Sequence, residues 1–243
     1  MSGHSKWSTI KRDKEKTDQA RGKIFTKIGK EIAVAVKAGG PDPATNPRLA
    51  TVIAKAKSNN MPNDNIQRSI KKASGEGSAV NYESMVYEGY GPGGCAVICD
   101  ILTDNKNRAS SDVRHIFDRA GGSLGGPGSV AFMFERKAVI ATKAKEGLTE
   151  DDVMMLAMDI EADDVDYAPE GYTFVGEATS LATMRGKLIA DGYEVVSAEL
   201  EMIANSTMDL PEDKYTSFMK MLDNLEENDD VQNVFHNVNL REE

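Results

Sequence analysis

The stretch ASGEGSAVN, residues 73–81, decides how this chain of 243 residues divides. Its small, polar and glycine residues are typical of a linker. On its N-terminal side apolar residues recur at helical spacing, whereas on its C-terminal side strand-like and helix-like segments alternate. Charge changes at the same place: residues 1–75 hold 16 Lys/Arg and six Asp/Glu, a net of +10, and residues 76–243 hold 13 and 33, a net of -20. These patterns indicate a basic helical head on an acidic body.

Three short amphipathic helices are predicted before the linker. The first runs from Asp18 to Gly39-Gly40, with apolar residues at helical spacing between 24 and 36. The second begins at Asn46-Pro47, a capping residue followed by proline at the first helical position. The third covers residues 63–72 after a tight turn. Together they predict a small three-helix bundle behind an extended basic arm.

The segments after the linker predict mixed α/β structure. Residues 82–89 and 95–101 form a predicted hairpin through GYGPGG, followed by a helix with apolar residues from 113 to 120, a Gly-rich loop, and a strand in SVAFMF at 129–134. Residues 135–204 have the β-α-β-β-α-β order of the split βαβ arrangement, including a helix opened by a Thr149–Asp152 capping box. A helix after Pro211 and a strand at 231–238 must pack elsewhere, and we assign them to the 80–134 segment.

The predicted fold class is therefore α+β, an N-terminal three-helix bundle followed by two ferredoxin-like α/β domains, one inserted in the other. The expected domains are residues 1–78 (basic arm and helical nucleic-acid-binding domain), 79–134 plus 205–243 (α/β domain), and 135–204 (inserted ferredoxin-like domain).

Composition and motifs argue against an enzyme. The three histidines are widely separated, no Walker lysine follows either Gly-rich loop, and DIEADDVDYAPE lacks the glycine of a calcium loop. Two cysteines cannot make a disulfide framework, and no apolar run is long enough for a membrane span or signal peptide. We expect a cytoplasmic, non-enzymatic protein with no cofactor, no metal, no small-molecule substrate and no membrane association.

The basic head predicts a nucleic-acid interface, because lysine and arginine neutralise phosphates. Trp7, the only tryptophan, could stack on an unpaired base; the equal alternative is a hydrophobic peg docked on the bundle. The residues expected to contact nucleic acid are His4, Lys6, Trp7, Lys11, Arg12, Lys14, Lys16, Arg21, Lys23, Lys27, Lys30, Arg68, Lys71 and Lys72.

A second polar site is predicted in TDNKNR, residues 103–108, where a strand runs into a helix. The N-terminus of a helix favours anions, so Asn105, Lys106, Asn107 and Arg108 are candidate anion-binding residues. The alternative is ordinary helix capping by Asp104 or Ser110.

Seven motifs resemble those of the YebC family, which includes the mitochondrial translational activator of cytochrome c oxidase. They are GHSKW at 3–7, RGKIFTKIGKEI at 21–32, GGPDPATNPRL at 39–49, NNMPNDNIQRSIKK at 59–72, YEGYGPGG at 87–94, TDNKNR at 103–108 and GSVAFMF at 128–134. The resemblance implies a helical domain and two α/β domains. It also implies either DNA-binding transcriptional regulation or a ribosome-associated role in translating polyproline stretches. Asp13 and Ala50 depart from the family's more basic pattern at those positions.

We therefore expect a nucleic-acid-binding regulator of gene expression, most simply a ribosome-associated translation factor that eases polyproline stalls. Ribosomal RNA is favoured as the partner because the predicted third helix offers few side chains that could read base edges, whereas a basic arm with a tryptophan suits partly unpaired RNA. A DNA-binding transcriptional regulator is the alternative. A protein-interaction scaffold that uses the acidic body to hold basic ribosomal proteins is a further one.

Overall fold

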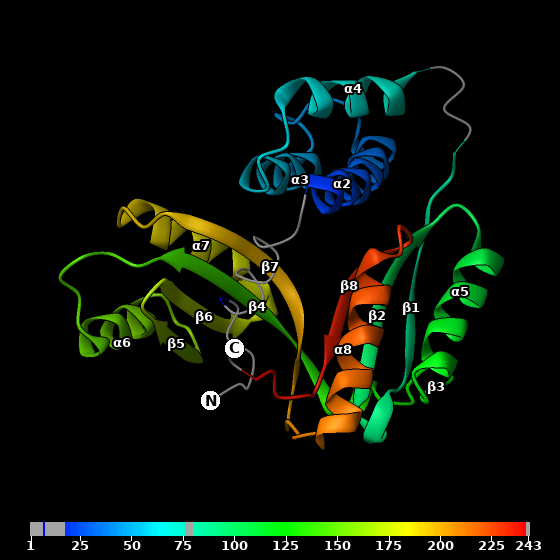
Figure 1. Cartoon of the computed structure of the whole chain (residues 1–243). Coiled ribbons are helices and arrows are strands. Elements are labelled where there is room, and N and C mark those ends of the chain that lie inside the picture. The colour runs from blue at the N-terminus through cyan, green and yellow to red at the C-terminus, as the bar shows by residue number, and fades with distance from the viewer. Residues whose placement is uncertain (1–6, 8–17, 76–79, 242–243) are drawn as a thin grey trace. The chain divides into compact units, whose positions relative to one another are not determined.

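A computed structural model of the protein describes residue 7, residues 18–75 and residues 80–241 (Figure 1). The described part contains N-terminal helices followed by two four-stranded sheets, each with helices packed on it. This arrangement confirms the predicted α+β fold class. None of the described helices is long and apolar enough to cross a membrane.

The N-terminal helices form a bundle with its own apolar core. They are α2 (Asp18–Gly39), α3 (Pro47–Ser58) and α4 (Asn63–Ser74). Asn46 caps α3 as its pattern predicts, since its side-chain oxygen accepts from the Leu49 amide at 3.1 Å. The same side chain donates to the carbonyls of Ala35 and Gly40, both at 2.8 Å. One buried asparagine thus starts α3 and fixes it against the end of α2.

The first sheet is built around the predicted hairpin. Its strands are β1 (Glu83–Tyr90), β2 (Ala96–Thr103), β3 (Ser123–Leu124) and β8 (Val231–His236), and its helices are α5 (Lys106–Arg119) and α8 (Glu212–Glu227). The strand order is β3-β1-β2-β8, so the two hairpin strands are central. In the ferredoxin-like arrangement the first and third strands are central, so this sheet shares that layering but differs in connectivity.

The second sheet has the ferredoxin-like order that the sequence pattern predicts. Its elements are β4 (Phe134–Lys143), α6 (Glu150–Asp159), β5 (Asp164–Ala168), β6 (Gly171–Glu177), α7 (Leu181–Ala190) and β7 (Val195–Ala204). The strand order is β5-β6-β4-β7, with every neighbouring pair antiparallel. The Thr149–Asp152 capping box opens α6 as expected. Every second residue of the central strands, including Ile140 of β4 and Phe174 of β6, faces the helices and contributes to the core under α6 and α7.

Two local predictions between the sheets are wrong. SVAFMF is not a strand: residues Ala131–Met133 form a short 3-10 helix, and β4 begins only at Phe134. Conversely, the Gly-rich loop contains the two-residue strand β3, which pairs with β1. A side chain at Gly89 would clash with the backbone of β3. β3 can therefore approach β1 closely because Gly89 has no side chain. β3 itself has two residues, too few to show the alternation of polar and apolar residues that would predict a strand.

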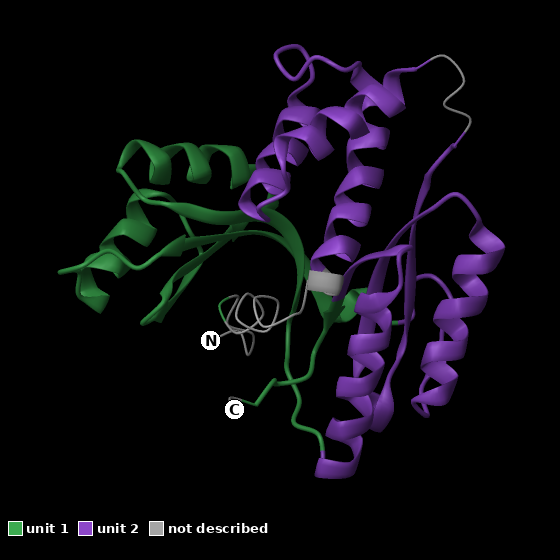
Figure 2. Ribbon diagram, turned by 45° about the horizontal axis from the view of Figure 1, so that its top comes forward, with its two compact units in different colours: residues 1–15, 130–210, 235–243 green, residues 16–129, 211–234 purple. Residues whose placement is uncertain are grey.

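The chain folds into two compact units (Figure 2). Among the described residues, unit 1 comprises Trp7, residues 130–210 and residues 235–241, and unit 2 comprises residues 18–75, 80–129 and 211–234. Unit 2 therefore contains both the helical bundle and most of the first sheet. The finer division into three domains stays a prediction.

Candidate functional site

Three of the lysines predicted to bind phosphate lie on one face of α2. Lys23, Lys27 and Lys30 are spaced four and three residues apart, which places them side by side on a helix. In unit 2 this face meets the C-terminal end of α8. The Nζ atoms donate to the backbone carbonyls of Glu227 at 3.2 Å, Glu226 at 2.6 Å and Asp229 at 2.8 Å, respectively.

These contacts compensate a helix end. The last carbonyls of a helix have no intrahelical partners and carry a partial negative charge. Within the described part of α8, residues Glu212–Glu227, no basic side chain occupies the last turn. Lys23 and Lys27 of α2 therefore supply from another helix the positive charge that α8 lacks, and Lys30 bonds to the Asp229 carbonyl, two residues beyond α8. In this structure the Nζ atoms of all three lysines are bonded within unit 2, and their predicted role in phosphate binding stays a prediction.

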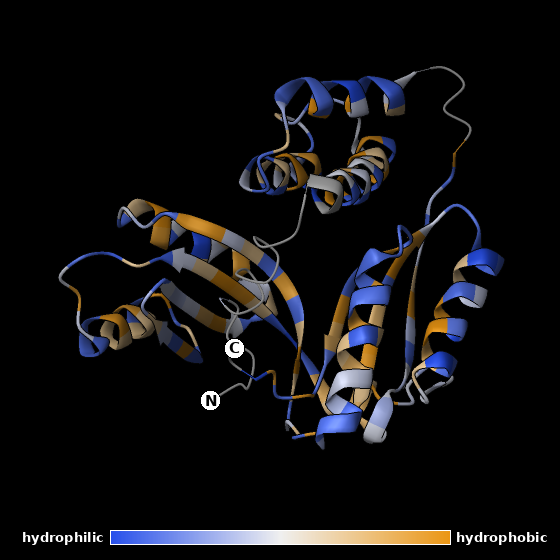
Figure 3. Cartoon of the chain, in the orientation of Figure 1, coloured by the Kyte–Doolittle hydropathy of each residue, from blue (hydrophilic) through white to orange (hydrophobic). Residues whose placement is uncertain are grey.

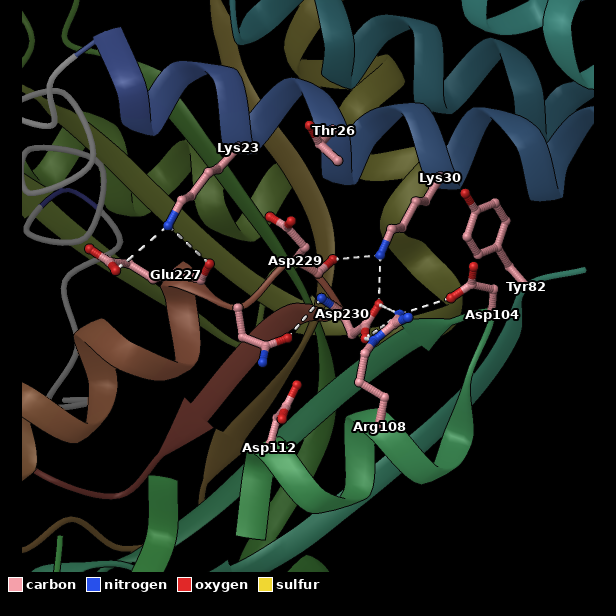
Figure 4. Close-up of a pocket in the computed structure, with 11 residues that line it drawn as sticks. Lys23, Thr26, Lys30, Tyr82, Asp104, Arg108, Asp112, Glu227, Asp229 and Asp230 are labelled. Carbon is pink, nitrogen blue, oxygen red and sulfur yellow. Dashed lines mark hydrogen bonds and ion pairs between the residues drawn. The ribbon is translucent and has the colours of Figure 1, made fainter. Parts of the chain in front are cut away.

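Just after α8 lies Asp230, a buried residue whose carboxylate pairs with two cations, Lys30 and Arg108 (Figure 4). Lys30 Nζ lies 2.7 Å from Asp230 Oδ1. Arg108 reaches the same carboxylate from α5: Nε lies 3.1 Å from Oδ2, and Nη2 lies 3.1 Å from Oδ1 and 2.8 Å from Oδ2. The side chain of Asp230 is 4% exposed, that of Lys30 11% and that of Arg108 47%. The cluster joins α2, α5 and the segment before β8.

The cluster is charged at neutral pH. Burial alone would raise the pKa of Asp230, but hydrogen bonds from Lys30 and Arg108, together with their positive charges, hold that pKa below its usual value. Hydrogen bonds to Asp230 and to Asp104 raise the pKa of Arg108. Arg108 Nη2 lies 2.8 Å from the Asp104 carboxylate, so two carboxylates balance the two cations.

A polar pocket of about 490 Å³ surrounds this cluster (Figure 4). Its lining residues are Lys23, Thr26, Lys30, Tyr82, Asp104, Arg108, Asp112, Glu227, Asn228, Asp229 and Asp230. Five of them are acidic and three are basic, which gives a net charge of -2. A negative lining disfavours phosphate, so the pocket is a poor place for a nucleic-acid backbone.

The predicted anion site in TDNKNR lies at the edge of this pocket. Asn105 caps α5, because its side chain accepts from the Arg108 amide at 3.1 Å; capping was the expected alternative, although Asp104 and Ser110 were the named candidates. Lys106 Nζ lies 2.5 Å from a Glu83 carboxylate oxygen, and Asn107 is exposed. Both cations of the motif are thus paired with carboxylates, which favours the structural interpretation over anion binding.

Trp7 is a buried peg rather than an exposed stacking platform. Its side chain is only 7% exposed, and a Cβ at Gly171, the first residue of β6, would clash with the indole ring. Gly171 lies on the same face of β6 as Thr173 and Val175. Tyr172 and Phe174 lie on the other face, in the core under the helices. The indole therefore packs on the sheet face opposite α6 and α7, in unit 1. The expected alternative placed the peg on the helical bundle.

The remaining candidates separate into two groups. His4, Lys6, Lys11, Arg12, Lys14 and Lys16 lie outside the described residues. Arg21, Arg68, Lys71 and Lys72 are exposed. Arg68 is three and four residues from the two lysines, so all three share one face of α4.

This face of α4 is one positive surface of the bundle. Residues 47–75 contain six Lys/Arg and a single acidic residue, Asp64, a net of +5. Asp64 lies in the first turn of α4 and the lysines in the last, an arrangement that also suits the helix dipole. We call Arg68, Lys71 and Lys72 the α4 basic face.

Comparison with known proteins places the whole chain in one group. Residues 5–76 match the model of the TACO1/YebC protein N-terminal domain, and residues 82–238 match that of the TACO1/YebC second and third domain. A Clostridium botulinum (strain Okra / Type B1) protein named "Probable transcriptional regulatory protein" is 54% identical over 242 residues, covering 100% of this chain and 98% of its own. An Acetivibrio thermocellus protein of the same name is 52% identical over 238 residues, 98% of each chain.

A solved structure has the same fold. It is the crystal structure of a conserved hypothetical protein, Aq1575, from Aquifex aeolicus. The TM-score is 0.84 at 41% sequence identity, and the match covers 94% of both chains.

Proposed function

The chain belongs to the TACO1/YebC family, and on that premise we propose that it is a non-enzymatic regulator of gene expression that binds nucleic acid through the α4 basic face. The observation that carries this proposal is the contrast between two basic helices. The lysines of α2 are bonded to the end of α8, whereas Arg68, Lys71 and Lys72 are exposed together on α4. Phosphate contacts require cations that solvent can reach, so the exposed α4 set is the better candidate for them.

We further propose that the nucleic acid is ribosomal RNA and that the protein acts on the ribosome, easing polyproline stalls. Two observations support this ribosomal proposal. They are the family resemblance and the shortness of α4, which has 12 residues and offers few side chains for bidentate contacts with base edges. The burial of Trp7 removes the other physical reason for RNA, because a buried indole has no free face on which a base could stack.

A DNA-binding transcriptional regulator is the second candidate. The names of the two relatives favour it, since each is named "Probable transcriptional regulatory protein". The two functions differ in what must be discriminated: a promoter reader separates base sequences by roughly 10³–10⁷-fold, whereas a ribosome-bound factor recognises one folded RNA surface.

The decisive experiment compares the full chain with two matched triple variants, R68Q/K71Q/K72Q on α4 and R119Q/K214Q/K220Q on α5 and α8. Both remove one exposed arginine and two exposed lysines. We expect the α4 variant to lose about tenfold or more in ribosome affinity at about 100 mM salt, with a shallower salt dependence, and the control to change less than about twofold.

The same proteins are then tested on a panel of DNA duplexes and on a polyproline translation reporter. Sequence discrimination below about tenfold among duplexes, with loss of reporter output in the α4 variant, supports the ribosomal proposal. Discrimination of several-hundred-fold for one duplex, without sedimentation on ribosomes, would replace it with the transcriptional candidate. Equal behaviour of the two triple variants would refute the α4 interface itself.

A further inference from the structure

Helix α6 of unit 1 exposes three methionines. Met154 is 57% exposed, Met155 65% and Met158 75%, the last being the highest value among the large exposed hydrophobic residues of the described chain. Figure 3 shows hydrophobic residues along this short helix as well as on the strands beside it. We call the three residues the α6 methionine face.

The methionines form one surface that the fold itself does not use. Met154 and Met158 are four residues apart and Met155 and Met158 three, so the side chains are neighbours on the helix. The core side of α6 is a different set, Val153, Leu156, Ala157 and Ile160, all buried. Hydrophobic burial therefore already holds α6 on its sheet without the methionines.

Acidic residues surround this apolar face. Residues 146–184 contain 11 Asp/Glu and no Lys/Arg, a net of -11. Glu150 and Asp151 precede the methionines and Asp159 follows them, all three exposed. The neighbouring edge strand β5 adds exposed Asp164 and Asp166. Lys187 of α7 approaches from outside this range, with its Nζ 3.3 Å from Glu161 and 2.9 Å from the Asp159 carbonyl.

We propose that the α6 methionine face is a docking site for a basic amphipathic helix of a partner protein. Contiguous exposed apolar surface marks interaction sites, and methionine is suited to them because its flexible, polarizable side chain adapts to different partners. The acidic surroundings select a partner whose apolar stripe is flanked by lysine and arginine.

The same charges argue against other occupants. Nucleic acid and anionic lipid would be repelled by the exposed carboxylates of α6 and β5, which are Glu150, Asp151, Asp159, Asp164 and Asp166. A second copy of this chain would bring two such acidic surfaces together. The proposal does not rest on nucleic-acid binding by α4, since it concerns unit 1 and a protein partner.

The test uses the full chain and a fluorescein-labelled leucine/lysine peptide of about 18 residues, long enough to form an amphipathic helix. A scrambled peptide of the same composition, without the apolar stripe, is the reference. We expect the amphipathic peptide to bind at least about tenfold more tightly than the scrambled one, measured by fluorescence anisotropy.

Three variants locate the site. M154Q/M155Q/M158Q is expected to weaken binding about tenfold or more, because it removes the apolar anchors. M154L/M155L/M158L, which keeps the apolar surface, is expected to bind within about threefold of the unchanged protein. E150Q/D151N/D159N is expected to weaken binding and to flatten its salt dependence. As a control, Val86→Gln removes an exposed apolar side chain from β1 and should leave the affinity unchanged.

Four results would overturn the proposal: equal binding of the two peptides, an unchanged affinity in the glutamine variant, tighter binding of vesicles than of peptide, or a dimer in sedimentation that the glutamine variant dissociates. Ribosome affinity of the glutamine variant separates the two proposals. If the glutamine variant loses peptide binding but keeps its ribosome affinity, the α6 methionine face and the α4 basic face act independently. If the α4 variant does not alter ribosome binding, the proposed function fails, and the peptide result still tests the α6 methionine face.

Discussion

The guanidinium of Arg108 donates to both carboxylate oxygens of Asp230, although 122 positions separate the two residues in the sequence. Two parallel bonds to a planar carboxylate fix the direction as well as the distance of approach. Because Lys30 bonds to the same carboxylate, one acidic side chain orients the start of α5, the middle of α2 and the segment before β8.

Asp230→Asn should destabilise the protein by about 2–3 kcal/mol, less than the ~3–5 kcal/mol for a fully buried pair because Arg108 is half exposed. The substitution leaves Lys30, which is nearly buried, without its charged partner. Urea unfolding monitored by circular dichroism measures the change.

Asp229→Asn is the matched control. Asp229 is adjacent and exposed, and Lys30 contacts its backbone carbonyl, which the substitution keeps. We expect a change of less than about 0.5 kcal/mol. Equal losses in both variants would mean that general charge near residue 230, rather than the buried carboxylate, stabilises the fold.

The stability of the protein should fall in acid partly through Asp230. Its pKa is lower in the folded chain than the ordinary value of about 3.9, so its contribution is full at neutral pH and is lost as the pH falls below about 4 toward the folded pKa. Thermal unfolding between about pH 6 and pH 2 should show a shallower decline in Asp230→Asn than in the unchanged chain. Parallel curves would contradict a lowered pKa at this residue.

Lys27→Gln should lower stability and Lys71→Gln should weaken nucleic-acid binding, although each removes one lysine from the N-terminal helices. Lys27 bonds to the end of α8, so its loss should cost about 0.5–1 kcal/mol, or about 1–4 °C in melting temperature, with little change in nucleic-acid affinity. Lys71 is exposed, so its loss should weaken binding and leave the melting temperature within about 1 °C. Weaker RNA binding by Lys27→Gln at unchanged stability would restore Lys27 to the interface.

Trp7→Ala should destabilise unit 1 by about 3 kcal/mol, because it removes a large buried side chain. The protein has one tryptophan, so its fluorescence reports on this position directly. We expect a blue-shifted emission that RNA does not quench and that moves to the red in Gly171→Ala, whose new methyl group would clash with the indole and with the backbone carbonyl of Thr142. Strong quenching by single-stranded RNA would instead indicate a stacking role.

Local chemistry made much of this fold predictable. The Asn46 cap with Pro47 behind it and the capping box at Thr149 depend on residues three positions apart, and the β-α-β-β-α-β pattern of residues 135–204 follows from hydrophobic periodicity. The roles of the lysines could not be predicted in this way. A lysine on α2 has the same local signature whether it faces solvent or the end of another helix about 200 residues away.

Trp7 illustrates the same limit. The sequence around it is basic and polar, which is typical of a nucleic-acid-binding arm, and nothing nearby indicates burial. Its partner is Gly171, where the informative feature is the lack of a side chain. The burial of Asp230 could not be predicted either, because the residue lies within an acidic run, residues 226–230, of the kind that is typical of solvent-exposed surface.

The contact between α2 and α8 also fixes an order of events during synthesis. Lys27 and its carbonyl partner are 199 positions apart, and a ribosome adding about 5–20 residues per second needs roughly 10–40 s to cover that distance. The buried and partly buried residues of the bundle core all lie between residues 24 and 73, so the bundle has what it needs to fold during that interval. Its lysine face then stays hydrated and cationic until the last helix emerges. Docking of α2 is thus a late step of folding, and a nascent chain arrested before residue 226 carries a bundle with a different surface charge from that of the finished protein.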